Sequence, residues 1–269
     1  MDTFVITHER RFIDVRVKEP YSRTLQHMSD LRCDLSTVRS LELSKCEALT
    51  ELPEWMGQFS SMTTLTIIEC GSLMRLSESL GQLTALTTLD LLACHNLTML
   101  PASMGHLKAL ASLQLRDCFA LTVLPNSLAN LTGLKCLCLI NCGGLRQLPE
   151  AMGRIRALEV VDLSKCNELT VLPASMGQLE SLRMLDLTRC CVMQKIPVGL
   201  ANVRRIKPYS PGHSIRWAWY YIKECIFLMV LAGRRNRRCA RRLPPELWMM
   251  ITQELMLTMV DIKKIGYFE

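Results

Sequence analysis

The sequence predicts an α/β fold built as a right-handed solenoid, in which each short repeated unit adds one strand to a parallel β-sheet on the concave side. Apolar residues recur every 24 residues over most of the 269-residue chain. In each unit two apolar residues flank one variable residue, which is the alternation of a short strand. A cysteine stands three residues after each pair, and seven such units follow without an insertion. A regular stack explains this pattern, because one unit alone cannot bury its own apolar residues.

Each predicted strand sends two side chains into the core, because alternate residues of a strand point to opposite faces. The first of the two is Leu41, Leu65, Leu89, Leu113, Leu137, Val161 or Leu185. The second is Leu43, Ile67, Leu91, Leu115, Leu139, Leu163 or Leu187. Equivalent strands should then lie side by side, about 4.8 Å apart.

The second half of each unit is expected to return along the convex side. Prolines that suit an extended or turn backbone recur there at Pro53, Pro101, Pro125, Pro149, Pro173 and Pro197. The whole unit, LxxLxLxxCxxLxxLPxxMGxLxxL, resembles the leucine-rich repeat over roughly residues 35–206. It is similar to the 24-residue form found in plant intracellular resistance proteins and Ras-scaffold-type repeat proteins. The resemblance implies a solenoid that presents its concave sheet to a partner.

The repeated cysteines are expected to be buried thiols. They are Cys46, Cys70, Cys94, Cys118, Cys142, Cys166 and Cys190. In leucine-rich repeats this position is Asn or Cys, and a thiol there would donate weakly to a loop carbonyl. Neighbouring thiols in such a ladder point the same way, which is poor geometry for a disulfide.

Reactive thiols are better sought outside this ladder, at Cys136, Cys138, Cys191, Cys225 and Cys239. No CxxC pair is present and the histidines are scattered, so we expect no zinc site and no other metal or cofactor. We also find no set of nucleophile, base and orienting group, and therefore expect no enzyme and no catalytic residue.

The variable strand residues form the candidate protein-binding site. The column between the inward residues reads Glu42, Thr66, Asp90, Gln114, Cys138, Asp162 and Asp186. The column two residues later adds Ile68, Leu92, Arg116 and Ile140. Exposed apolar residues framed by charges are typical of protein–protein sites. The alternative is that these side chains only follow β-propensity.

The ends of the chain differ from the repeats. We assign residues 1–34 to an N-terminal cap, in which Phe12–Val17 alternates like a strand, and residues 35–206 to seven repeats. Apolar residues are missing at the next two strand positions, Tyr209 and Pro211, so the stack should stop there. Residues 207–269 would form a helical C-terminal cap, with a short α-helix over 214–232. Lys223 and Glu224 interrupt its apolar run, so we expect no membrane attachment.

The positive charge is confined to this last segment. Residues 1–203 hold 19 Lys/Arg and 20 Asp/Glu, whereas residues 204–269 hold 13 and 5. Six arginines crowd into residues 234–242. A hinge or a targeting signal explains them better than nucleic-acid binding, because no aromatic residues are interleaved for base stacking.

A helix is predicted just after the arginines. Pro244 and Pro245 can open it. The residues that would dock it are Leu243, Pro244, Glu246, Leu247, Ile251 and Leu255. The segment resembles the opening helix of an F-box, and the basic stretch before it is similar to the tail of a SOCS-box. Either resemblance implies docking on a ubiquitin-ligase linker protein. A second capping helix is the alternative.

Three functions remain open at this point. The first is a scaffold that binds a protein on the concave face, and the second is a substrate adaptor of a ubiquitin ligase. The third is an immune or signalling sensor fragment without its nucleotide-binding domain, since no GxxxxGK[ST] loop occurs. We see no signal peptide, and 13 cysteines cannot all pair within the chain. We therefore expect a cytoplasmic or nuclear protein, and not a secreted one.

Overall fold

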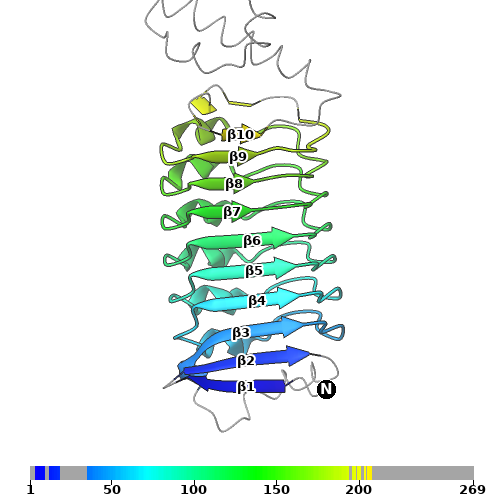
Figure 1. The fold of residues 1–269 in the computed structure, drawn as a ribbon, viewed down its shortest axis with the longest axis vertical. Helices are drawn as coiled ribbons and strands as arrows, with labels where there is room; N and C mark the ends of the chain where they lie inside the picture. Colours follow the sequence, from blue (N-terminus) through cyan, green and yellow to red (C-terminus); the bar gives the residue numbers. More distant parts are fainter. Residues whose placement is uncertain are drawn as a thin grey trace, which may run out of the picture. The chain divides into compact units, whose positions relative to one another are not determined.

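The computed structural model describes residues 4–9, 12–18, 35–193, 196–197, 199–200, 203 and 205–207. They form one ten-stranded sheet whose strands follow one another in chain order (Figure 1). Seven of the strands belong to the repeats: β3 (Val38–Ser44), β4 (Thr64–Ile68), β5 (Thr88–Leu92), β6 (Ser112–Arg116), β7 (Cys136–Cys138), β8 (Val160–Asp162) and β9 (Met184–Asp186). All seven pair in parallel, with residues 24 apart side by side. The predicted seven parallel strands are confirmed.

Two strands precede the repeats. β1 (Phe4–Glu9) pairs with β2 (Phe12–Lys18) in antiparallel orientation, and β2 pairs with β3 in parallel. The register of β2 on β3 shifts by one residue between Ile13 and Asp14. The strand predicted over Phe12–Val17 is thus present, and it continues the parallel sheet.

The sheet also extends beyond the seventh repeat. β10 (Arg205–Lys207) pairs in parallel with β9 and places Ile206 beside Leu185. The prediction that the stack stops without another strand is wrong. Ile206 lies 21 residues after Leu185, so this connection is three residues shorter than the others and a search at the fixed 24-residue spacing misses it.

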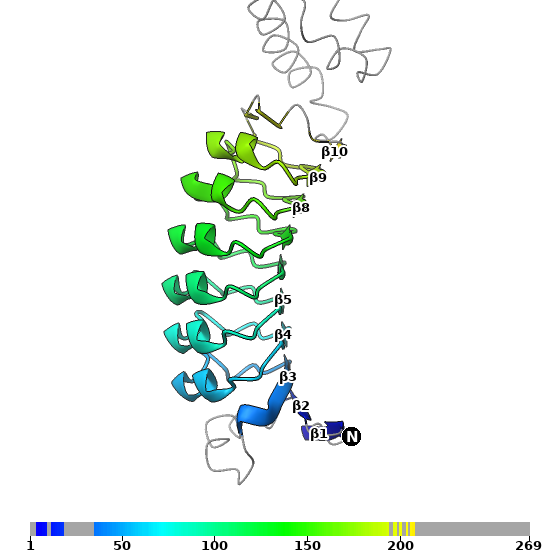
Figure 2. The same ribbon diagram turned by 90° about the vertical axis from the view of Figure 1, so that its left-hand side faces the viewer.

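Short 3-10 helices form the opposite layer (Figure 2). One, η2 (Leu35–Thr37), precedes β3. Six recur between the strands: η3 (Glu54–Gln58), η4 (Glu78–Gln82), η5 (Ala102–His106), η6 (Asn126–Asn130), η7 (Glu150–Arg154) and η8 (Ala174–Gln178). Five of these six begin after a proline with φ between −56° and −68°, which a proline ring holds without cost. Before η4 the residue is Ser77, whose Oγ accepts a hydrogen bond from the N–H of Ser79.

Neighbouring 3-10 helices approach one another closely at their glycines. A Cβ placed on Gly153 would lie 2.1 Å from the carbonyl oxygen of Ser175, and one on Gly81 would lie 2.6 Å from that of Ser103. No side chain fits at such distances. These two glycines are therefore needed for packing.

The core lies between the two layers. Every predicted inward strand residue is buried, as are the recurring leucines of the returning halves and the methionines Met56, Met104, Met152 and Met176 of the 3-10 helices. Phe59 and Met62 are among the largest side chains that are fully enclosed. The apolar residues that recur in the sequence are therefore the residues that hold the units together.

Candidate functional site

The candidate site is the sheet face, which we define as the side of β3–β9 opposite the 3-10 helices. Pairing places Thr66 beside Asp90, Asp90 beside Gln114, and Gln114 beside Cys138. Ile68, Leu92 and Arg116 form a second row of neighbours. The sequence-predicted residues on the face are half-buried except Asp186, which is 4% exposed.

The centre of the face combines apolar side chains with polar atoms that lack partners. Leu92 and Ile68 stand beside Asp90, whose Oδ1 is buried and accepts no hydrogen bond from the described residues. Burial raises the pKa of the Asp90 carboxyl, against the opposing charge of Arg116. Arg116 donates through Nη2 to Gln114, while its buried Nε has no acceptor among the described residues. A ligand that supplied a donor and an acceptor here would satisfy both groups.

Two of the predicted acidic residues accept hydrogen bonds from backbone N–H groups. Asp162 Oδ1 accepts from the N–H of Ser164 at 2.9 Å, and Asp186 Oδ1 accepts from the N–H of Thr188 at 3.0 Å. Such local bonds favour a turn over a strand. They accompany the shorter strands β8 and β9, and they leave each aspartate less free to bind a partner than sequence reasoning assumed.

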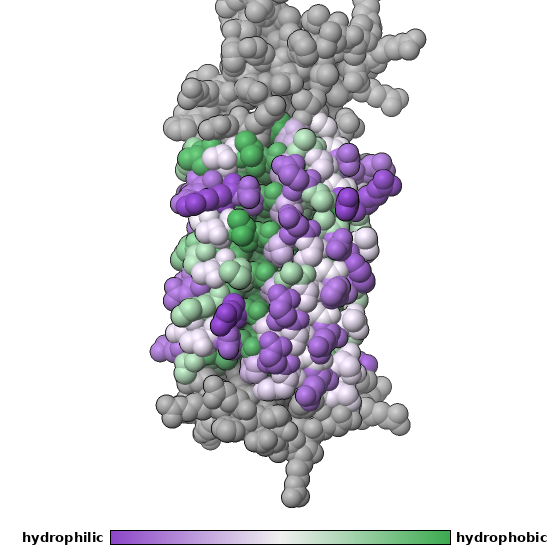
Figure 3. All heavy atoms as spheres, turned by 180° about the vertical axis from the view of Figure 1, so that it is seen from behind, coloured by the Kyte–Doolittle hydropathy of each residue, from purple (hydrophilic) through white to green (hydrophobic). Residues whose placement is uncertain are grey.

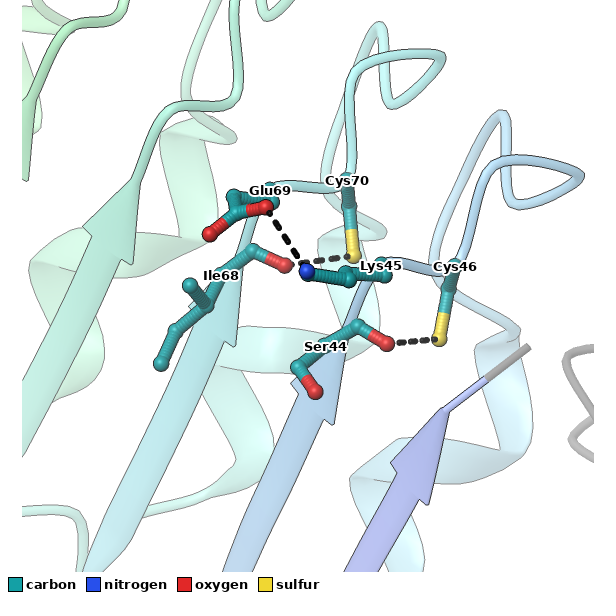
Figure 4. Close-up of polar contacts among 6 residues, drawn as sticks. All are labelled: Ser44, Lys45, Cys46, Ile68, Glu69 and Cys70. Atoms are coloured by element: carbon teal, nitrogen blue, oxygen red, sulfur yellow. Dashed lines mark hydrogen bonds and ion pairs between the residues drawn. The ribbon is translucent and has the colours of Figure 1, made fainter. Parts of the chain in front are cut away.

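The residues that end the strands adopt an unusual backbone conformation. One residue in each repeat, directly before the ladder cysteine, has a positive φ, although none is glycine. They are Lys45, Glu69, Ala93, Asp117, Asn141, Lys165 and Arg189, with φ between 53° and 63°. The N–H of Lys45 bonds to the carbonyl of Ile68 in the next repeat at 2.8 Å. The Lys45 and Glu69 side chains form an exposed ion pair of 3.6 Å (Figure 4).

The ladder cysteines lie just behind these turns. Cys70 Sγ is 3.5 Å from the carbonyl oxygen of Ile68, and Cys46 Sγ is 3.7 Å from that of Ser44 (Figure 4). All seven are at most 1% exposed, as the sequence predicted. Burial raises the pKa of Cys94 and of Cys190 to about 12. These thiols are therefore neutral at physiological pH.

Cys136 and Cys138 behave differently. Both are half-buried on the sheet face of β7, and their sulfurs lie 3.5 Å apart. The hydrogen bond from Cys138 lowers the pKa of Cys136 to about 7, although burial opposes that effect, and it raises the pKa of Cys138. The sequence analysis named both residues as candidates for reactive thiols, because neither belongs to the ladder of buried cysteines.

The side of the repeats opposite the sheet face carries an apolar stripe that the sequence analysis missed (Figure 3). Figure 3 shows apolar side chains running along the stack on the side opposite the sheet face. Among the large exposed apolar residues are Met99, at 56%, and Val123 and Val171, at 42% and 41%. These three share one repeat position, five residues after the ladder cysteine, so reading that column down the sequence would have found them. Met99 forms a short parallel bridge with Arg75.

The remaining predictions concern residues outside the described part. Cys225, Cys239, the arginines of 234–242 and the docking helix from Leu243 to Leu255 all lie there. Within the described ranges no group of three metal-ligating side chains occurs. No helix in those ranges combines the length and apolarity of a membrane span.

Comparisons with known proteins return solved structures only. No family model and no curated protein matches the chain. The leucine-rich repeat domain of the type III effector XopL is 23% identical over 73% of this chain and 85% of that chain, with a TM-score of 0.48. The Arabidopsis receptor kinase HAESA, solved with the peptide hormone IDA and the co-receptor SERK1, is 25% identical over 72% and 40%, with a TM-score of 0.44.

An internalin from Listeria monocytogenes is 15% identical over 65% of this chain and 69% of that chain, at a TM-score of 0.35. At these scores the assignment depends on the features of the chain itself. These are the 24-residue repeat, the in-register parallel sheet and the buried cysteine in every unit. By these features the chain has the leucine-rich-repeat fold.

Proposed function

We propose that this protein is a non-enzymatic scaffold that binds a protein partner on the sheet face. The observation that carries the proposal is the centre of that face, where half-buried Leu92 and Ile68 adjoin Asp90 with its unpartnered oxygen. Binding a complementary surface is favourable for such a patch, because it buries the apolar side chains and can supply the hydrogen-bond donor that the carboxylate lacks. Ile140, on the other side of Arg116, extends the apolar surface.

The expected partner offers an apolar anchor flanked by basic groups. Burial of the anchor against Leu92 would supply most of the affinity, because desolvated central contacts dominate binding energies. A basic group of the partner would donate a hydrogen bond to Asp90 Oδ1 and oppose the burial that raises the pKa of this carboxyl. Charges at the rim, such as Lys45 and Glu69, would influence association rate more than affinity.

A crosslinking experiment tests the face directly. A photoreactive amino acid at position 92 should capture a protein from cell extract, whereas the same probe at Arg156, on the helical side, should not capture that protein. Arg156 is exposed and follows η7. Binding of the captured protein, once purified, must then fall when Leu92 is changed to Arg. Equal capture from both positions would contradict the proposal.

The ubiquitin-ligase adaptor is a second candidate, supported by the sequence of residues 243–257 alone. In that case the sheet face would hold the substrate and the C-terminal segment would dock on the linker. A pull-down of Skp-type and elongin-type linker proteins, with the full chain and with a chain ending at Arg242, separates the two functions. Retention by the full chain only would support the adaptor.

A reducing compartment suits either function. The ten cysteines of the described residues are all free thiols, and seven of them belong to the core. We therefore propose a cytoplasmic or nuclear location, in which such thiols persist. Cell fractionation of the tagged full chain tests this.

A further inference from the structure

Two cysteine side chains lie next to each other on the sheet face of β7. Cys136 and Cys138 are two positions apart in β7, so their side chains point to the same side of the strand. Their sulfurs are 3.5 Å apart and both thiols are half-buried, which leaves them open to small reagents. Cys136 pairs with Ser112 and Val160 in the neighbouring strands, and Cys138 pairs with Gln114 and Asp162.

The surroundings of the pair favour one thiolate beside one thiol. The Cys138 thiol donates to Cys136, and Ser112 and the Arg116 charge also stabilise the Cys136 anion, while Asp162 opposes it. The pKa of Cys136 is lowered to about 7, which favours its thiolate at neutral pH more than that of an ordinary cysteine. The pKa of Cys138 is raised, which keeps its proton in place.

A bond between the two sulfurs requires a local change in the backbone of β7. Residues two apart in a strand have Cα atoms about 6.6 Å apart. That separation lies within the range of about 4.4–6.8 Å found for disulfides. The Cβ atoms of such side chains, which point the same way, are also about 6.6 Å apart, beyond the about 3.5–4.5 Å of a disulfide, so closure requires a local bend of β7.

We propose that Cys136 and Cys138 form an oxidisable dithiol, a modification site that closes to an intramolecular disulfide in the presence of a peroxide. The Cys136 thiolate attacks one peroxide oxygen, the O–O bond breaks, and a sulfenic acid forms at Cys136 as the released hydroxide takes up a proton to become water. The Cys138 sulfur then attacks the sulfenic sulfur and displaces its hydroxyl, which leaves as a second water with the Cys138 proton. Two thiols lose two electrons in total and one hydrogen peroxide is reduced to two waters.

Proximity contributes more to this reaction than acidity does. The lowered pKa of Cys136 gives it more thiolate at neutral pH than an ordinary thiol has. The lower basicity of this thiolate also reduces its nucleophilicity, so the two effects partly cancel. The distinguishing feature is therefore the resolving thiol of Cys138, held 3.5 Å away. The inference is independent of whether the sheet face binds a protein.

Mass spectrometry of the oxidised full-length protein tests the proposal. Reduced protein is exposed to hydrogen peroxide, denatured, alkylated and digested with trypsin, which releases residues 136–146 as one peptide containing Cys136, Cys138 and Cys142. We expect a product two hydrogens lighter, with a single alkyl group on buried Cys142. The pair should lose alkylation at least about tenfold faster than Cys142, and a dithiol reductant should restore it.

Variants assign the roles of the two thiols. Cys138→Ser should stop at a sulfenic acid on Cys136 that dimedone traps, whereas Cys191→Ser, at an exposed cysteine outside the pair, should still form the disulfide. Preferential oxidation of Cys191, a disulfide between two chains, or persistence of both free thiols would overturn the proposal. It would also be overturned if the untreated pair resisted alkylation until a chelator was added, because that result indicates a metal site.

Discussion

The thiol of Cys166 lies 3.1 Å from the carbonyl oxygen of Leu139, directly after β7 in the preceding repeat. The same relationship joins Cys190 to Leu163 at 3.0 Å and Cys142 to Leu115 at 3.5 Å. From Cys70 onward, each ladder cysteine thus occupies a buried site and also bonds to the unit before it. This double role explains why the cysteine recurs in every repeat.

A charge in the ladder should unfold the stack. We expect Cys118→Asp to lower the free energy of unfolding by several kcal/mol, because an unpaired carboxylate would be buried at a fully enclosed position. Urea unfolding followed by circular dichroism measures this change. Cys191→Asp, at an exposed cysteine, is the matched control and should change the free energy by less than about 0.5 kcal/mol. Equal midpoints for the two variants would show that the ladder is not buried in solution.

Alkaline pH should weaken the fold through the same thiols. The folded pKa of Cys94 is raised to about 12, above the value of about 8.5 in the unfolded chain. Its contribution is therefore complete below about pH 8.5 and is lost as pH rises toward 12. Within this window the stability should fall by up to about 1.4 kcal/mol per pH unit for each such thiol.

Cys94→Ala isolates one thiol in that measurement. Between pH 9 and 10.5 the free energy of unfolding should fall less steeply with pH in the variant than in the wild type, because one fewer proton is released on unfolding. This holds whatever the overall stability of the variant. An unchanged slope would mean that the Cys94 thiol ionises as readily in the folded chain as in the unfolded one.

The turn after each strand offers a stabilising substitution. Ala93 has a φ of 54°, a conformation that costs an L-residue about 1 kcal/mol and glycine almost nothing. We expect Ala93→Gly to raise the melting temperature despite the greater entropy of glycine in the unfolded chain. Ala109→Gly is the control. Ala109 is exposed and is not among the residues with positive φ, so this variant should be less stable than the wild type. A similar loss at both positions would rule out the strained turn.

A methyl group at a helix contact should be destabilising. Gly153→Ala places a Cβ 2.1 Å from the backbone oxygen of Ser175, so η7 and η8 would have to separate, at a cost of about 1–3 kcal/mol. Gly143→Ala meets nothing within 4 Å and should be neutral or slightly stabilising. Thermal unfolding of the two variants provides the comparison. A smaller loss for Gly153→Ala than for Gly143→Ala is inconsistent with the close packing.

The repeated part of the fold could be predicted from the sequence because one spacing specifies it seven times. The same regularity explains the error at β10, where Ile206 pairs with Leu185 at 21 residues instead of 24. The antiparallel pairing of β1 also could not be predicted, since alternation does not reveal the direction of a strand. Regular spacing predicts only those strands that obey it.

The candidate site was predictable in position but not in chemistry. The columns placed Asp90 and Asp162 on one face, yet only the structure shows that Asp162 bonds to Ser164 while Asp90 Oδ1 has no partner among the described residues. A control variant on the helical side must avoid residues that hold a turn, and Lys108 is such a residue. Its Nζ donates to the carbonyls of Gly105 and Asn130, both at 2.8 Å, so Lys108→Glu would disturb the turn. Arg156 is the better choice.

The affinity of the captured partner for three variants tests the central claim most directly. Leu92→Arg should weaken binding at least about tenfold, because it places a charge in the apolar centre without changing an inward leucine. Asp162→Asn should weaken binding less and reduce its dependence on salt. Arg156→Glu should leave the dissociation constant unchanged. The opposite result, with Leu92→Arg binding normally and Arg156→Glu failing to bind, would place the partner on the helical side and contradict the account.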